Sequence, residues 1–184
     1  MRIVAGRFKG AAIVAPKSQA TRPTSDRLRE TIFNILAHGL ETEVDGARVL
    51  DLFAGSGALG LESLSRGARH CTFIEEGAEA RGVIRRNMEA LGLNGVAKIF
   101  RRDATRLGDA GNIEPFDLMF ADPPYGKGLA DKALLTAGAG GWVKSGSVCV
   151  IEERAGVDVC LPQGFEELDH RVVGDSQVLF LKVA

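Results

Sequence analysis

The segment Phe-Ala-Asp-Pro-Pro-Tyr-Gly at residues 120–126 combines residue types that can bind and activate an aromatic amine. An exocyclic base amine is a poor nucleophile because its lone pair is delocalised into the ring. Asp122 and a proline carbonyl can accept its two N–H groups and favour the geometry in which its nitrogen attacks a methyl sulfonium. The prolines fix the backbone and donate no competing N–H, and the ring of Tyr125 offers a face for base stacking. The candidate catalytic residues are therefore Asp122, Pro123, Pro124 and Tyr125.

A glycine-rich loop supplies a candidate site for the second reactant. The stretch from Asp51 to Glu62 contains Gly55-x-Gly57-x-x-Gly60, which formally matches the dinucleotide-binding pattern. Glycines let the backbone approach a ligand closely, and the following helix presents free N–H groups. Glu75 lies at the end of the next expected strand, where an acid can accept from ribose hydroxyls. These features predict a nucleoside-containing ligand.

The carboxylate of Asp51 favours one ligand class over another. A carboxylate just ahead of the glycines would face the pyrophosphate of a dinucleotide unfavourably. The same group can accept from an ammonium group or orient backbone N–H groups and water. S-adenosylmethionine has an ammonium, a sulfonium and no phosphate, so the sequence favours this methyl donor. Asp103, after a third expected strand, can accept from the adenine amino group or cap a short helix over 104–107.

Alternating strand and helix patterns position these residues. Strands are expected over 47–53, 70–76, 96–104, 116–125, 146–153, 165–173 and 176–184, with helices within 54–68, 78–93 and the first part of 129–142. The alternation predicts a mainly parallel α/β sheet, with ligands bound beyond the carboxyl ends of its strands. Gly174-Asp175 predicts a closing hairpin and one antiparallel strand.

The front of the chain is basic, whereas the rest is acidic. Residues 1–30 have a formal charge of +5, and the remainder has −6. Two interpretations of this basic segment are open: it contacts a polyanion locally, or it is a solvated arm. We expect a small hairpin over Val4–Val14 and a helix that Thr24 or Ser25 caps and that ends near Gly39. Basic residues at that helix start oppose the helix dipole, which favours a functional use for Arg22, Arg27 and Arg29.

Composition limits the remaining classes. The 184 residues suit one domain, divided here into a basic extension at 1–40 and a catalytic domain at 41–184. We expect neither a membrane span nor a signal peptide. Cys71, Cys149 and Cys160 lack metal-ligand spacing, so buried thiols in a reducing cytoplasm are expected and a metal is not. Nothing in the sequence requires more than a monomer.

Several segments together carry a family resemblance. MRIVAGRFKG, RPTSDRLRETIFNIL, DLFAGSGALGLESLSRGA and DPPY, in this order, resemble the RsmD-type bacterial family of class I S-adenosylmethionine-dependent methyltransferases. The resemblance covers nearly the whole chain. It implies a Rossmann-like fold with a seven-stranded sheet and an N-terminal hairpin-and-helix extension, and methylation of the N2 amine of one guanine in 16S ribosomal RNA. The implied substrate is RNA within a ribonucleoprotein particle.

The same resemblance assigns roles to particular residues. The donor would be bound by Asp51, Phe53, Ala54, Gly55, Gly57, Glu75, Asp103, Ala104 and Asp122. RNA would be contacted by Arg2, Arg7, Lys9, Arg22, Thr24 and Arg27, although Thr24 and its neighbours could instead shape the pocket.

Three other functions remain open at this point. Asp-Pro-Pro-Tyr alone does not name the base, so an adenine-N6 or cytosine-N4 methyltransferase acting on DNA or RNA is possible. An NAD-dependent oxidoreductase would use the glycines but leaves Asp122 unexplained. A ribosome-binding module that kept the fold without catalysis is the fourth reading.

Overall fold

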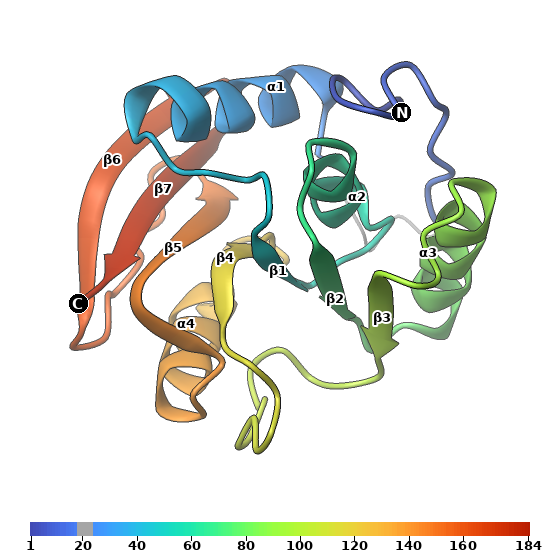
Figure 1. The fold of residues 1–184 in the computed structure, drawn as a ribbon. Helices are drawn as coiled ribbons and strands as arrows, with labels where there is room; N and C mark the ends of the chain where they lie inside the picture. Colours follow the sequence, from blue (N-terminus) through green and yellow to red (C-terminus); the bar gives the residue numbers. More distant parts are fainter. Residues whose placement is uncertain (18–23) are drawn as a thin grey trace.

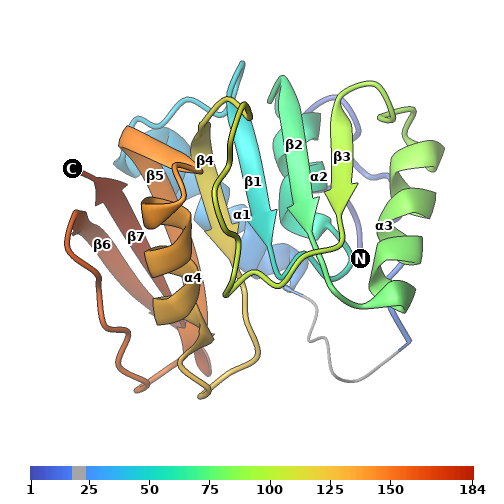
Figure 2. The same ribbon diagram turned by 90° about the horizontal axis from the view of Figure 1, so that it is seen from below.

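The computed structural model describes residues 1–17 and 24–184, and it shows one seven-stranded sheet with helices on both faces (Figures 1 and 2). The spatial order is β3-β2-β1-β4-β5-β7-β6. The strands are β1 Arg48–Leu52, β2 His70–Ile74, β3 Ala97–Phe100, β4 Phe116–Ala121, β5 Val143–Arg154, β6 Phe165–Val173 and β7 Ser176–Val183. The helices are α1 Asp26–Asn34, the π-helical turn η1 Ile35–Gly39, α2 Ala58–Ser65, α3 Ala78–Ala90 and α4 Leu129–Ala139.

The two faces of the sheet are covered by different helices. Helices α1, α2 and α3 pack on one face, in a core that includes Val49, Phe120 and Phe180. Helix α4 packs on the other face, against Leu50, Met119 and their neighbours, and Figure 2 shows it on the side opposite α1 and α2. Strands buried on both faces read as continuous apolar runs, which explains the composition of β1 and β4.

Strand alternation places four polar residues on the face covered by α1 and α2. Successive side chains point to opposite faces. Asp51 therefore shares the face of Val49, and Asp122, one residue beyond β4, shares the face of Phe120. By the same rule, Glu152 near the end of β5 and Ser176 at the start of β7 point to this face.

The C-terminal hairpin confirms the predicted reversal. β6 and β7 are joined by Gly174 and Asp175, and Gly174 has a φ of +60°, the left-handed region that suits glycine. β7 is antiparallel to both β5 and β6, while the other pairings are parallel. The predicted mainly parallel sheet with one antiparallel strand is confirmed.

The N-terminal segment differs from the hairpin expected over Val4–Val14. It is a loop closed by a single antiparallel bridge between Arg2 and Ala12. Backbone hydrogen bonds at its base begin with Met1, whose carbonyl accepts from Ile13. Glycine-rich turns at 5–10 interrupt regular pairing, so two strands do not form. Ile3 and Ile13 are buried in the core of the α1–α2–α3 face. The division at residue 40 stays a prediction.

One local prediction was wrong: Cys160 is exposed, whereas Cys71 and Cys149 are buried as expected. Of the two alternatives for Asp103, the cap of a short helix does not form, because residues 104–107 are not helical and Asp103 accepts from Thr105 in a tight turn. Within the described residues, no helix is long and apolar enough to cross a membrane.

Candidate active site

A cavity of about 670 Å³ lies at the carboxyl ends of the central strands. This is the edge where open parallel sheets bind ligands, and the volume lies within the usual range for small-molecule sites. Its wall joins the glycine loop to the Asp-Pro-Pro-Tyr segment, so the structure brings the two predicted motifs together. The candidate residues in the wall are Asp51, Phe53, Ala54, Gly55, Glu75, Asp103, Ala104, Asp122, Pro123, Pro124, Tyr125 and Thr24.

Asp51, on β1, holds the helix that follows the glycine loop. The Asp51 Oδ2 atom accepts from the backbone N–H of Gly60 at 3.0 Å, inside the first turn of α2. Gly57 precedes α2 with a φ of +80°. A Cβ at Gly60 would lie 2.4 Å from a ring carbon of Phe73, so only glycine lets α2 pack this closely on the sheet. A Cβ at Gly57 would lie 3.1 Å from Phe73 and 3.4 Å from Ile84, and Gly57 is not among the residues that line the cavity.

Asp51 is almost fully buried and close to other acids. Burial is the main cause that raises its pKa to about 8, the hydrogen bond from Gly60 opposes the shift, and Glu75 adds to it. A cation in the cavity would favour the ionised form of this carboxyl. The position of Asp51 thus suits a ligand with a positive charge.

Glu75 joins the end of β2 to the glycine loop. Its Oε1 atom accepts from the N–H of Gly55 at 2.8 Å, and its Oε2 atom accepts from the N–H of Gly77 at 2.9 Å. Carboxylate oxygens can each accept a further hydrogen bond. Glu75 therefore keeps capacity for ligand hydroxyls while it fixes the loop that borders them.

Asp103 lies on the same wall, beyond β3. Its Oδ1 atom accepts from both the N–H and the hydroxyl of Thr105, at 2.8 and 2.7 Å. These hydrogen bonds, the one from the hydroxyl foremost, lower the pKa of Asp103. An ionised Asp103 beside Ala104 can accept from an amino group of a ligand in the cavity.

Negative charge dominates the wall. Among the described residues that line it, the acidic ones outnumber the basic ones, and Arg102 is the basic one. The Arg102 guanidinium donates to the carbonyl of Leu107 and lies over the rings of Phe100 and Trp142. The acidic members are Asp51, Glu75, Glu76, Glu79, Asp103 and Asp122. Such a wall repels a pyrophosphate and attracts a cationic ligand.

Asp122 lies at the other end of the cavity, beside a second buried acid. The Thr24 hydroxyl donates to Asp122 Oδ2 at 2.9 Å and lies 3.3 Å from Glu152 Oε2. Burial and the neighbouring Glu152 carboxylate raise the pKa of Asp122 well above its ordinary value, although the Thr24 hydrogen bond opposes this. Parallel pairing aligns Ala121 with Ile151, which brings the residues that follow them side by side.

Tyr125 is anchored through its hydroxyl as well as offering its ring. The hydroxyl donates to Glu152 Oε1 at 2.8 Å and lies 2.8 Å from the hydroxyl of Ser176. Burial raises the pKa of Tyr125 to about 12, so the phenol remains a donor near neutral pH. The next residue, Gly126, donates to Glu153 at 3.1 Å. The Asp-Pro-Pro-Tyr segment is thus tied to the end of β5.

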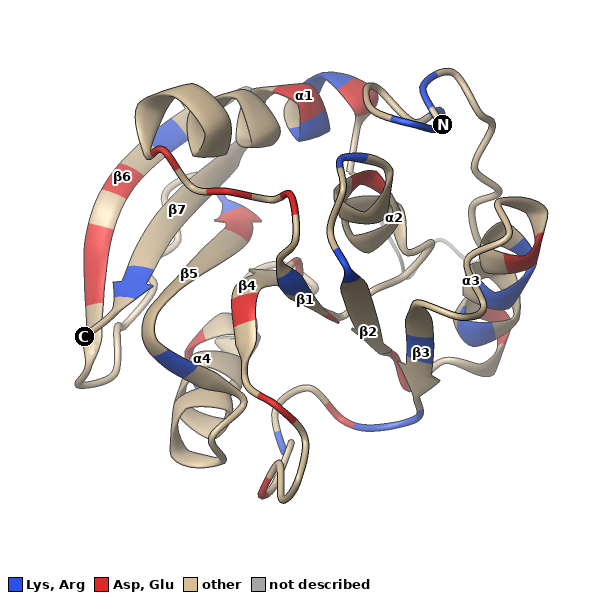
Figure 3. Ribbon diagram, viewed as in Figure 1, with Lys and Arg blue, Asp and Glu red and all other residues tan. Residues whose placement is uncertain are grey.

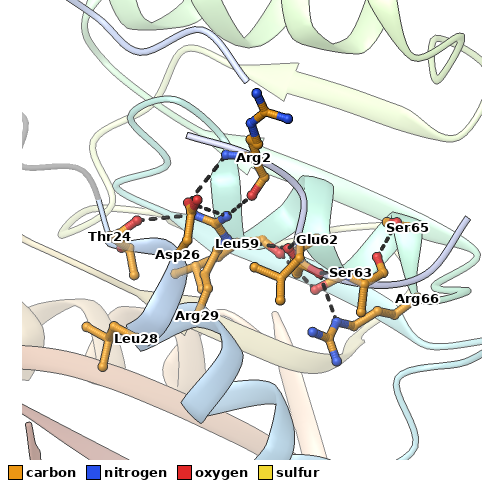
Figure 4. A network of polar contacts seen from close by, with 12 residues as sticks. Arg2, Thr24, Asp26, Leu28, Arg29, Leu59, Glu62, Ser63, Ser65 and Arg66 are labelled. Carbon is orange, nitrogen blue, oxygen red and sulfur yellow. Dashed lines mark hydrogen bonds and ion pairs between the residues drawn. The ribbon is translucent and has the colours of Figure 1, made fainter. Parts of the chain in front are cut away.

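The N-terminal loop is bound to α2 by Glu62 (Figure 4). The buried Glu62 carboxylate accepts from the N–H groups of Val4 and Ala5 at 2.9 and 3.0 Å. Arg66 and Arg29 form ion pairs with it at 3.0 and 3.4 Å. A helix that begins at the glycine loop therefore also holds the front of the chain in place.

Comparisons with known proteins identify the family. The family model described as "Conserved hypothetical protein 95" matches residues 1–182. A Bacillus subtilis protein, YlbH, is 44% identical over 138 residues, covering 74% of this chain and 72% of that protein. Ribosomal RNA small subunit methyltransferase D of Escherichia coli is 36% identical over 152 residues, covering 83% and 74%. The chain belongs to the RsmD-type methyltransferase family.

Solved structures agree with this membership. The structure of the Escherichia coli protein yhhF aligns with a TM-score of 0.84 at 30% identity and covers 100% of this chain and 97% of that one. The predicted Rossmann-like class I methyltransferase fold is confirmed.

The family's Arg-Pro-Thr element falls partly outside the described residues, since Arg22 lies in 18–23. Thr24 is 6% exposed and lines the cavity, which favours the alternative in which it shapes the pocket, and its contact with RNA stays a prediction. The functional use expected for Arg29 is also corrected. Its side chain is buried and donates to the carbonyls of Thr24 and Arg2 (Figure 4). Arg27, by contrast, is exposed on α1.

The other basic residues of the front segment remain available at the surface. Arg2, Arg7 and Lys9 have exposed side chains, and Figure 3 shows blue residues along the loop near the N-terminus. The Arg7 guanidinium also lies 4.7 Å from the ring centroid of Phe8. Their contact with RNA stays a prediction for this family member.

Sequence reasoning missed Glu152, Ser176 and Glu62. Glu152 could have been found, because an acid at the carboxyl end of a parallel strand was the signal that selected Glu75. Ser176 had no such signal, since its place depends on β7 pairing with β5. Glu62 had no signal either, because its partners Val4, Ala5 and Arg29 lie in distant parts of the chain. In the described part of the chain, no group of three or more His, Cys, Asp or Glu side chains could hold a metal ion.

Proposed function

We propose that this protein transfers the methyl group of S-adenosylmethionine to the exocyclic N2 amine of a guanine in small-subunit ribosomal RNA. One observation carries the proposal: a single cavity joins an acidic, glycine-rich end to the Asp-Pro-Pro-Tyr segment. The acidic end suits a cationic ligand without phosphate, and the other end suits an amine donor. The names of the curated relatives support ribosomal RNA as the substrate class.

The residues fit the methyl donor at each of its polar groups. Asp51 can accept from the ammonium, Glu75 from the ribose hydroxyls and Asp103 from the adenine amino group. Phe53, Ala54 and Gly55 line the cavity in which the donor would bind. When bound, the donor supplies an electrophilic methyl group on a sulfonium. The acidic wall of the cavity stabilises that positive charge on binding.

The amine is positioned by Asp122 and the Pro123 carbonyl. Both atoms are acceptors, so together they can take the two N–H groups of the amine and aim its lone pair at the methyl carbon. The ring of Tyr125 borders the same cavity and can stack on the base. The base must leave its stack to reach this site, as in other enzymes that modify exocyclic groups. We expect a monomer acting on RNA within a ribonucleoprotein particle.

Titration calorimetry tests the donor half of the proposal. We expect S-adenosylmethionine and its product S-adenosylhomocysteine to bind and NAD to show no binding. Binding of NAD without binding of the methyl donor would contradict the proposal. Methylation of adenine N6 or cytosine N4 in place of guanine N2 would keep the enzyme class and change the base.

A further inference from the structure

Glu152 lies directly behind the wall that contains Asp122. It is 5% exposed, near the end of β5, and does not itself line the cavity. Its Oε1 atom accepts from the Tyr125 hydroxyl at 2.8 Å and from the Ser176 hydroxyl at 3.3 Å. Its Oε2 atom faces Thr24 at 3.3 Å. Glu152 therefore contacts two cavity residues, Thr24 and Tyr125, from the buried side.

Between Thr24, Asp122 and Glu152 there is one proton fewer than the two hydrogen bonds that the geometry allows. The Thr24 hydroxyl has a single proton and two carboxyl neighbours, Asp122 Oδ2 and Glu152 Oε2. The Thr24 hydroxyl thus bridges the two carboxyl groups. Among the described residues, no Lys or Arg forms an ion pair with either of them. Two adjacent buried carboxylates without a cation cannot both ionise, so the pair retains a proton.

The charged groups around Asp122 and Glu152 support the conclusion that this carboxyl pair retains one proton. Burial and Glu152 raise the pKa of Asp122, and the nearby Asp51 carboxylate acts in the same direction. Tyr125 stays a neutral donor because burial raises its pKa. The Arg29 guanidinium is bonded to the Thr24 carbonyl and to the acids Asp26 and Glu62.

A hydroxyl between the two carboxyl groups can accept one proton and donate another. If Glu152 Oε2 is protonated, it donates to Thr24 Oγ1, and Thr24 donates its own proton to Asp122 Oδ2. Asp122 Oδ1, to which no described residue donates, then accepts from the amine. The two hydroxyl donors on Glu152 Oε1 leave Oε2 as the oxygen that carries the proton.

We propose that Glu152 is a positioning residue of the amine site: with Thr24 it holds the proton of the carboxyl pair and keeps Asp122 an ionised acceptor. This inference rests on the proposed function. In the reaction, the amine nitrogen forms a bond to the methyl carbon while the carbon–sulfur bond breaks and its electron pair goes to sulfur. The nitrogen then loses one proton, which Asp122 accepts and releases to water in the cavity.

Two substitutions at Glu152 separate a proton-holding role from a role that needs negative charge. Glu152→Gln has an amide N–H that permanently replaces the carboxyl O–H and keeps an acceptor for Tyr125 and Ser176. Its single-turnover methylation rate should stay within about threefold of wild type at neutral pH. Glu152→Ala should lose about tenfold or more. Glu166→Gln, on the exposed side of β6, is the matched control.

The pH profile of the rate distinguishes a neutral Glu152 from an ionised one. The glutamine side chain copies the neutral carboxyl group, so the acid limb of the rate profile in Glu152→Gln should stay at the wild-type pH. An acid limb that moves to lower pH, as it would if Gln removed a negative charge from beside Asp122, a Gln variant as slow as the Ala variant, or an Ala variant as fast as wild type would each overturn the inference. Donor affinity measured by calorimetry shows whether each variant still folds around the cavity.

A spectroscopic measurement keeps this test separate from that of the proposed function. In an Asp51→Asn background, which removes the other raised carboxyl, infrared spectra at neutral pH should show a protonated-carboxyl band. Both Asp122→Asn and Glu152→Gln should remove that band. Its persistence in either variant, or its absence before substitution, contradicts the shared proton even if the wild-type protein methylates no base. Failure of wild-type methylation with the band present would instead contradict only the proposed function.

Discussion

The two ends of the cavity hold their carboxyl groups by different means. At the donor end, Asp51 and Glu75 accept from backbone N–H groups of the glycine loop and its helix. At the amine end, Asp122 and Glu152 are held by side-chain hydroxyls from three separate segments of the chain. Backbone donors stay in place whatever the side chains are, whereas each hydroxyl can be removed alone. The amine end is therefore the more sensitive to single substitutions that leave the fold intact.

The largest expected effect is at the amine end. Asp122→Ala should lower the single-turnover methylation rate by about 100-fold or more, because it removes the acceptor that aligns the amine. Donor affinity should stay within a few-fold, since the other donor contacts remain. Radiolabel transfer to ribosomal RNA measures the rate, and calorimetry measures the affinity. A fully active variant, or one that loses donor binding in proportion, would erase the distinction between the two ends.

The matching substitution at the donor end should show the opposite pattern. Asp51→Asn should weaken donor binding by about tenfold or more, because a charged hydrogen bond to the ammonium is lost. Asp109→Asn is the control, because this exposed carboxylate lies outside the cavity wall and accepts from the local N–H of Gly111. Calorimetric dissociation constants decide the outcome. Unchanged affinity in Asp51→Asn would remove this residue from the donor site.

The pH dependence of the donor end follows from the raised pKa of Asp51, about 8. Only the ionised carboxyl pairs with the ammonium, so wild-type donor affinity should rise from pH 6 to 8 and that of Asp51→Asn should be flatter. The stability of the ligand-free protein should change with pH in the opposite direction. Between about pH 4 and 8 the folded protein keeps a proton that the unfolded chain has lost, so this carboxyl destabilises the fold progressively as pH rises. Thermal melts of both proteins across that range test the sign.

Gly60 tests how closely α2 must pack behind the donor loop. Gly60→Ala would place a Cβ 2.4 Å from Phe73 and 2.6 Å from the Cys71 sulfur. A loss of about 1–3 kcal/mol in unfolding free energy is expected from this overpacking. Gly82→Ala, in α3 with open space around its Cβ, should instead stabilise by about 0.5–1 kcal/mol. Denaturant unfolding of the pair compares the sites directly, and equal effects would refute the close approach.

Charge reversal of the front loop should affect RNA binding and neither end of the cavity. Replacing Arg2, Arg7 and Lys9 by Glu should weaken RNA binding roughly tenfold at low salt, with the difference shrinking as salt rises. Arg171→Glu, which reverses one exposed base on β6 outside the loop, is the control for a charge change elsewhere. Filter binding at several salt concentrations measures the slope. Equal affinities at low salt would exclude the loop from the RNA interface.

The smallest effect is expected from Tyr125→Phe. The variant keeps the ring and loses the hydroxyl that donates to Glu152, so the methylation rate should fall by about two- to tenfold. Tyr125→Ala should lose more, because the stacking face disappears as well. A Phe variant indistinguishable from wild type would show that the hydroxyl contributes nothing to positioning.

The same contrast explains what could be predicted from the sequence. Asp51, the glycines and Glu75 act through local backbone geometry, and their spacing in a strand-loop-helix unit is enough to find them. Asp122 was found because its prolines break the strand pattern. The mainly parallel sheet and the closing hairpin also followed from local signals.

The remaining features depend on contacts between distant segments. Thr24 and Asp122 are 98 residues apart, and no local pattern shows that α1 begins beside the end of β4. Ser176 reaches the site only because β7 inserts between β5 and β6. The basic residue Arg29 suggested surface function by its position at a helix start, but Glu62 and Asp26 compensate its burial.

The central claim is that this cavity joins a methyl donor to the N2 amine of a guanine held by Asp122. Ribosomal RNA from a strain lacking this protein can be treated with the purified wild type or Asp122→Ala and a donor with a deuterated methyl group, then mapped by mass spectrometry. We expect one guanine in the small-subunit RNA to gain the label on N2 with the wild-type protein and no gain with the variant. Label on another base, or equal labelling by both proteins, would contradict the account.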